Sequence, residues 1–160
     1  MNLVFVDCEA HGPCPSQGTL TEFAAVLNRS TTFYRKLWDT IPDKDTPAIP
    51  IPQKQIYDEQ KAFQEFEQWI KTFCNKPTFI SDNPAYDWQW INDGFHRSIG
   101  YNPFGFSARR IGDFYAGLCR DFSKSNDWKR LRITKHTHNP LDDAMGNYEA
   151  FQRILKHEQL

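Results

Sequence analysis

The hydrophobic residues of the chain form short continuous runs at some places and helically spaced sets at others. Residues 3–6 are a continuous apolar run rich in β-branched side chains, which predicts a central strand covered on both faces. Residues 20–27 and 31–38 predict two more strands, and residues 28–30 between them indicate an antiparallel hairpin. Residues 78–80 predict a further short strand.

Helical spacing of apolar residues marks the other elements. Residues 59–73 predict an amphipathic helix that crosses back over the sheet. A second helix is expected from Pro84 to about Ser98, with Gly100 ending it. Residues 111–119 predict a shorter helix, and Asn139-Pro140 opens the last one.

Residues 39–57 carry four prolines and predict an irregular surface loop that flanks the functional site. Strands first, then helices interleaved with strands, indicate an α/β domain with a mixed central β-sheet flanked by helices. The order resembles an RNase H-like fold. With 160 residues, 39% of them hydrophobic, we expect one domain spanning residues 1–160.

Composition narrows the function. A formal net charge of −1 excludes a broad positive field that tracks a long polyanion, so any grip on nucleic acid must be local. Cys8, His11 and Cys14 resemble half of a zinc site, but no second pair follows at a suitable distance. No secretory signal and no apolar run of about 20 residues is present, so we expect a cytoplasmic protein with reduced thiols and no membrane contact.

Three acidic segments carry the candidate chemistry. Asp7 and Glu9 stand two positions apart at the end of the first predicted strand, so their side chains leave the same face. Close carboxylates repel unless a hard divalent cation lies between them. For this pair alone, a solvated strand end is an equally good interpretation.

The second segment places Asp87 in the first turn of the helix after residues 78–80, on the same rim of the sheet as the first pair. A carboxylate that only balances the helix dipole is the alternative. In the third segment, His138 lies in a loop and Asp143 in the first turns of the last helix. This arrangement suits a general base beside a metal ligand. Asp142 points about 100° away from its neighbour and is assigned to capping or solvent.

Together, these segments resemble the DEDDh 3'-5' exonuclease family in order and spacing, over nearly the whole chain. The matching residues are Asp7-x-Glu9, Asn83-x-x-Tyr86-Asp87, and His138 followed five positions later by Asp143-Ala144. The likeness is greatest to small bacterial and phage 3'-5' exoribonucleases, and more distant to oligoribonuclease and ribonuclease T. Many relatives have Thr and Phe where this chain has Ala10 and Tyr86.

The resemblance implies two divalent cations, Mg²⁺ or Mn²⁺. Asp7 would bridge both, Glu9 and Asp143 would complete one site, and Asp87 would hold the other, partly through water. His138 would activate the attacking water, and nucleoside 5'-monophosphates would be released from the 3' end of a single strand. The resemblance favours RNA as the substrate, and it implies a homodimer.

Other features leave alternatives open. A basic run from Lys129 to His136 would hold the nucleic-acid backbone or be merely solvated. Of Trp88 and Trp90, at most one is expected to face the site. Asp113 is explained equally well as a helix cap. The competing functions are a 3'-5' DNA exonuclease of proofreading or repair type, and a nucleic-acid-binding module without catalysis.

Overall fold

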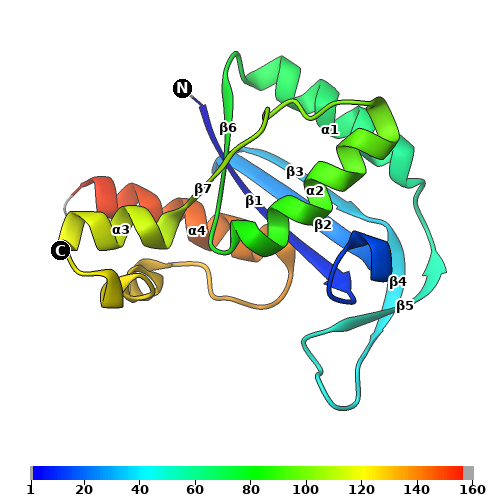
Figure 1. Ribbon diagram of the computed structural model, residues 1–160, viewed down its shortest axis with the longest axis horizontal. Helices are drawn as coiled ribbons and strands as arrows, with labels where there is room; N and C mark the ends of the chain where they lie inside the picture. The colour runs from blue at the N-terminus through cyan, green and yellow to red at the C-terminus, as the bar shows by residue number, and fades with distance from the viewer. Residues whose placement is uncertain (1, 157–160) are drawn as a thin grey trace.

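A five-stranded mixed sheet forms the centre of the computed structural model, which describes residues 2–156 (Figure 1). The strand order is β3-β2-β1-β6-β7. The strands are β1 (Asn2–His11), β2 (Thr19–Asn28), β3 (Thr31–Lys36), β6 (Pro77–Ser81) and β7 (Ala108–Arg110). The pairs β1–β2 and β2–β3 are antiparallel, whereas β1–β6 and β6–β7 are parallel. The predicted α/β architecture with a mixed sheet is confirmed, and it is consistent with an RNase H-like fold.

Helices cover both faces of this sheet. They are α1 (Glu59–Phe73), α2 (Pro84–Ile99), α3 (Ile111–Cys119) and α4 (Pro140–Leu155), with short 3-10 turns at Pro15–Gln17, Phe122–Lys124 and Asp127–Leu131. Residues of α1 and α2 share one apolar cluster with Val4 and Val6, whereas residues of α3 and α4 share another with Phe5. Since side chains alternate along a strand, Asp7 and Glu9 lie on the same face as Phe5, toward α4.

The predicted helix boundaries agree closely with the structure. Gly100 ends α2 in the left-handed conformation at φ 86°, a conformation that glycine adopts without steric cost. The side chain of Asn139 accepts a hydrogen bond from the Leu141 amide at 2.9 Å and so caps α4. Among the described residues, no helix is both long and apolar enough to cross a membrane.

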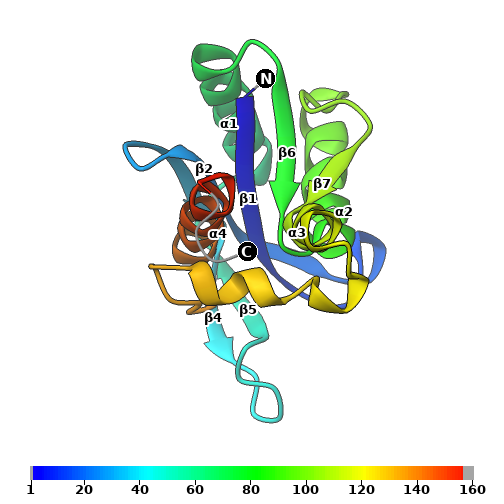
Figure 2. The same ribbon diagram turned by 90° about the vertical axis from the view of Figure 1, so that its left-hand side faces the viewer.

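The prediction of an irregular loop over residues 39–57 is wrong in part. Strands β4 (Trp38–Pro42) and β5 (Pro50–Gln55) pair as an antiparallel hairpin that projects from the main sheet (Figure 2). A two-stranded ribbon consists of edges only, so prolines can occupy positions whose amides would otherwise face solvent. Two further differences are strand β7, which was not predicted, and β1, which runs past Glu9 to His11.

Candidate active site

Asp7 and Glu9 lie on the part of β1 that no longer pairs with β6. Pairing between β1 and β6 ends at Phe5, whereas pairing with β2 continues to His11. The segment that carries Asp7 and Glu9 is therefore held rigidly on one side and open on the other. This position, beyond the carboxyl end of β6, is where open α/β sheets commonly bind ligands.

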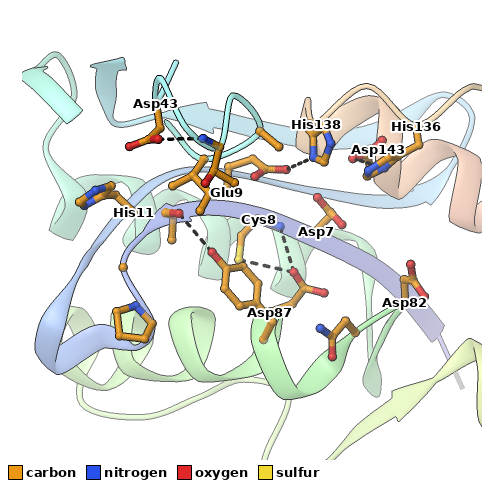
Figure 3. Close-up of a pocket in the computed structure, with 18 residues that line it drawn as sticks. Asp7, Cys8, Glu9, His11, Asp43, Asp82, Asp87, His136, His138 and Asp143 are labelled. Atoms are coloured by element: carbon orange, nitrogen blue, oxygen red, sulfur yellow. Dashed lines mark hydrogen bonds and ion pairs between the residues drawn. The ribbon is translucent and has the colours of Figure 1, made fainter. Parts of the chain in front are cut away.

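Asp143 on α4 meets this pair from the helical layer. It is 2% exposed, and its Oδ1 accepts a hydrogen bond from the Thr137 amide at 3.0 Å. One carboxylate oxygen from each of Asp7, Glu9 and Asp143 lies within 4.8 Å of the other two. The structure thus brings together three of the predicted metal ligands (Figure 3).

Asp87 approaches the same strand from α2, on the other side of β1. Its Oδ1 accepts hydrogen bonds from the Cys8 amide at 3.3 Å and from the Cys8 thiol at 3.5 Å. Burial raises its pKa to about 7, although the hydrogen bonds from Cys8 oppose the rise. Asp87 lines the same cavity as the three clustered carboxylates but is not part of their compact set.

His138 stands over the cluster from the loop before α4. Its Nδ1 lies 3.9 Å from Glu9 Oε1, and its backbone adopts φ 61°, in the left-handed region. A residue with a β-carbon is strained there, and such strain concentrates at functional sites. The imidazole lies beside Glu9 (Figure 3) while its side chain stays 48% exposed.

The acidic cluster is electrostatically unfavourable on its own. Burial raises the pKa of Asp7 well above its ordinary value, with Asp87 and Asp143 as the next causes. Burial likewise raises the pKa of Glu9 to about 8, assisted by the charges of Asp143 and Glu22. Glu22 lies directly opposite Glu9 in the β1–β2 pair, where like charges destabilise a sheet. A cation would relieve this repulsion.

The loop that carries His138 is tied to α4 by several contacts. Glu149 is buried and accepts a hydrogen bond from the Thr134 amide at 2.7 Å. Arg132 donates to Asn147 Oδ1 at 2.5 Å. A β-carbon on Gly146 would lie 2.6 Å from the Thr134 carbonyl oxygen. The loop therefore packs against the helix at a distance that only glycine at position 146 permits.

A cavity of about 730 Å³ opens over these residues and is large enough for a nucleotide. Beyond the acidic residues, it is lined by Tyr86 and His11 and by the 43–49 turn of the β4–β5 hairpin, which contributes Ile49. As expected, this part of the chain flanks the candidate site. Tyr86 donates a hydrogen bond from its hydroxyl to the Ala10 carbonyl at 3.2 Å, which holds its ring at the cavity wall.

Several residues singled out in the sequence do not line the cavity. Trp90 is buried in the core and Trp88 packs on Phe79, so neither lines the cavity. Asp113 pairs with Arg110 at 2.9 Å, outside the cavity.

Of the basic run, Lys129 and Arg132 pair with Asp82, at 2.8 and 3.4 Å. Asp142 accepts from the Thr137 hydroxyl at 2.8 Å and so helps to shape the loop before α4.

Two residues of the site are not identified by the sequence pattern. His136 is expected only as part of the basic run, yet its Nδ1 lies 2.7 Å from Asp143 Oδ2. Its spacing of two from His138 is the signal that the sequence offers. Glu22 comes close to Glu9 only through strand register, which the sequence pattern does not fix.

Similarity to a known nuclease agrees with this geometry. No family model matches the chain. The chain is similar to the 3'-5' DNA exonuclease Cap18 of Escherichia coli. The two are 26% identical over 170 aligned residues, covering 96% of this chain and 91% of the relative. The similarity therefore spans the fold and the candidate site together.

The donor set fits hard divalent cations. Asp7, Glu9 and Asp143 offer only oxygen ligands, which Mg²⁺ and Mn²⁺ accept. All three face one open cavity, and burial with mutual repulsion raises the pKa of two of them. The chemistry of these residues thus agrees with the predicted metal site.

Proposed function

We propose that this protein is a metal-dependent 3'-5' exonuclease, which hydrolyses the terminal phosphodiester bond of a single strand and releases nucleoside 5'-monophosphates. The observation that carries the proposal is the convergence of Asp7, Glu9 and Asp143, whose oxygens lie within 4.8 Å of one another. His138 beside Glu9 adds an imidazole to the same cavity. This combination of carboxylates and imidazole is suited to phosphodiester hydrolysis.

The metal-binding roles divide between the two sides of β1. Asp7, Glu9 and Asp143 would hold one divalent cation, and Asp87 together with Asp7 would hold a second. Two such ions, when bound, stabilise the charges on the attacking and leaving oxygens of an in-line displacement. Asp87 is anchored by Cys8 at a fixed place on the edge of the strand, so it would keep its position whether or not an ion is bound.

His138 would take the proton of the attacking water. Its Nδ1 faces Glu9, which leaves Nε2 as the nitrogen available to accept a proton. Thr137 and the capping residue Asn139 hold the flanking backbone. The imidazole therefore stays at the cavity while its ring keeps the freedom to adjust to a substrate.

DNA is the substrate that we favour. The sequence-based expectation of RNA rested on resemblance to exoribonucleases, whereas the relative similar over 96% of this chain is named a DNA exonuclease. The alternative from the sequence, a 3'-5' DNA exonuclease, thus has the better support. Homodimer formation and a cytoplasmic location stay predictions.

The test is cleavage of matched 5'-labelled single-stranded DNA and RNA of the same sequence, in Mg²⁺ and in Mn²⁺, with EDTA as the control. We expect a ladder that shortens from the 3' end, faster on DNA, and lost with EDTA or in Asp7→Asn. Faster cleavage of RNA would reverse the sugar preference while keeping the reaction. Intact substrate in all lanes, together with binding in a gel-shift assay, would show that the protein is a nucleic-acid-binding module and not an enzyme.

A further inference from the structure

Two imidazoles lie close to the carboxylate of Asp143. His136 Nδ1 lies 2.7 Å from Asp143 Oδ2, and the ring centroids of His136 and His138 are 4.3 Å apart. One donor atom from each of the three residues lies within 4.8 Å of the other two (Figure 3). This cluster shares Asp143 with the acidic cluster. Its other two donor atoms are imidazole nitrogens, whereas those of the acidic cluster are carboxylate oxygens.

Within the described part of the chain, the oxygen at the centre of this cluster accepts no hydrogen bond. Asp143 is 2% exposed, and its Oδ1 is occupied by the Thr137 amide, but Oδ2 receives no hydrogen bond from the residues that the structure describes. The short contact with His136 brings the two atoms together without the geometry of a hydrogen bond. A buried carboxylate oxygen without a donor is costly, and a cation would satisfy it.

The donor types select among cations. Mg²⁺ prefers oxygen ligands, whereas imidazole nitrogen suits Zn²⁺ and its neighbours in the first transition series. Two histidines and one carboxylate, with a position left for water, are a common ligand set of zinc. Donor atoms of a tetrahedral zinc site stand about 3.3 Å apart, given Zn–N bonds of about 2.0 Å. His136 and His138 have side chains 49% and 48% exposed, so their rings have room to move to that spacing.

We propose that His136, His138 and Asp143 form a zinc site, and that Zn²⁺ bound there inhibits the nuclease by competing with the activating cations. The inhibitory part rests on the function proposed above. Zinc on His138 takes the lone pair with which the imidazole would accept the proton of water. Zinc on Asp143 removes one of the three clustered carboxylates from the Mg²⁺ site. One ion thus blocks both the base and a metal ligand.

Zinc binding is measured first, without substrate, by calorimetric titration of the metal-free protein. We expect the affinity for Zn²⁺ to fall by about tenfold or more in His136→Asn and in His138→Asn, because each loses a ligand. His11→Asn is the matched control, because His11 lines the same cavity outside the cluster. Its zinc affinity should equal that of the unchanged protein. Circular dichroism confirms that each variant is folded.

A second readout identifies the ligand atoms. In ¹⁵N-labelled protein, the imidazole nitrogens of His136 and His138 should shift together at one equivalent of Zn²⁺. Mg²⁺ should shift them much less, because it binds the neighbouring carboxylates and not the imidazole nitrogens. Zinc that shifts neither imidazole, or binds His136→Asn as tightly as the unchanged protein, would overturn the site.

The regulatory consequence is tested separately, as the Zn²⁺ concentration that halves cleavage at fixed Mg²⁺. It should rise by about tenfold in His136→Asn, in step with the lost affinity. It should also rise with added Mg²⁺. Equal inhibition of the unchanged protein and His136→Asn would overturn competition at this site. Zinc binding by both histidines in a protein without any nuclease activity would contradict the proposed function and leave the zinc site standing.

Discussion

The backbone amide of Cys8 donates a hydrogen bond to Asp87 Oδ1 at 3.3 Å. This bond joins the open edge of β1 to the first turn of α2. Since Asp7 and Glu9 flank Cys8 in the strand, it also fixes Asp87 relative to both of them. The acidic site is therefore built around one segment of backbone, which holds its carboxylates close together.

Removing one charge from this cluster should stabilise the metal-free protein. Asp7→Asn keeps the size of the side chain but removes a buried charge that is repelled by Asp87 and Asp143. In EDTA at pH 8, we expect Tm to rise by about 2–4 °C for each kcal/mol of relief. Differential scanning calorimetry measures this. In Mg²⁺, cleavage by this variant should be abolished. An unchanged or lower Tm would mean that the carboxylates do not strain the metal-free fold.

Stability without metal should fall as pH rises. The pKa of Glu9, about 8, and that of Asp87, about 7, lie above their ordinary values of 4.5 and 3.8. The folded state therefore binds protons more tightly than the unfolded chain. The resulting stabilisation is complete below pH about 4 and is lost as pH rises through 7 and 8.

Thermal unfolding in EDTA between pH 5.5 and 8.5 measures that loss. We expect Tm to decline across the range and the decline to be smaller in Asp7→Asn. Mg²⁺ added at pH 8 should restore Tm, because a bound cation replaces the protons. A Tm in EDTA that stays level or increases toward pH 8.5 contradicts the raised pKa values.

The predictable part of this site follows from local periodicity. Because strand side chains alternate, the sequence alone assigns Asp7 and Glu9 to one face. The helix boundary at Pro84 likewise places Asp87 in a first turn at the sheet edge. Both conclusions depend only on neighbours in the chain, and the structure agrees with both placements.

The remainder depends on contacts between distant segments. The pairing of Glu22 with Glu9 follows from strand register, and the approach of His136 to Asp143 follows from the path of an irregular loop. The hairpin of β4 and β5 was not predicted because its prolines are tolerated only in a ribbon whose strands both have a free edge. Such features are not encoded by spacing alone.

The strained backbone of His138 should be detectable as a difference between two substitutions. At φ 61°, glycine is unstrained whereas alanine is not. We expect His138→Gly to exceed His138→Ala by about 1 kcal/mol in free energy of unfolding, measured in urea. Both should lose cleavage by about 10²- to 10⁴-fold, because both lack the base. Equal stability of the two variants would show that the loop relaxes and that the strain has no energetic weight.

The close approach of the loop to α4 can be tested with a pair of helical glycines. Gly146→Ala would place a β-carbon 2.6 Å from the Thr134 carbonyl oxygen, whereas Gly117→Ala on α3 meets nothing within 4 Å. Alanine should therefore stabilise at Gly117 by about 0.5–1 kcal/mol and destabilise at Gly146. Only Gly146→Ala should reduce kcat, since it displaces the loop that carries His138. If Gly146→Ala had the same kcat as Gly117→Ala, the packing of the loop on α4 would not be needed for catalysis.

The hairpin should contribute to substrate binding more than to the chemical step. Ile49 is 38% exposed and lines the cavity, whereas Ile56 is 45% exposed and does not. If the apolar side chain at Ile49 packs on the terminal nucleotide, Ile49→Ser should raise KM by about threefold to tenfold, and kcat should change little. Ile56→Ser is the matched control, with the same loss of apolar surface away from the cavity. Steady-state kinetics on single-stranded DNA distinguishes them. Equal KM values for the two variants would show that the hairpin only borders the site, whereas a loss confined to kcat would give Ile49 a role in placing the scissile bond.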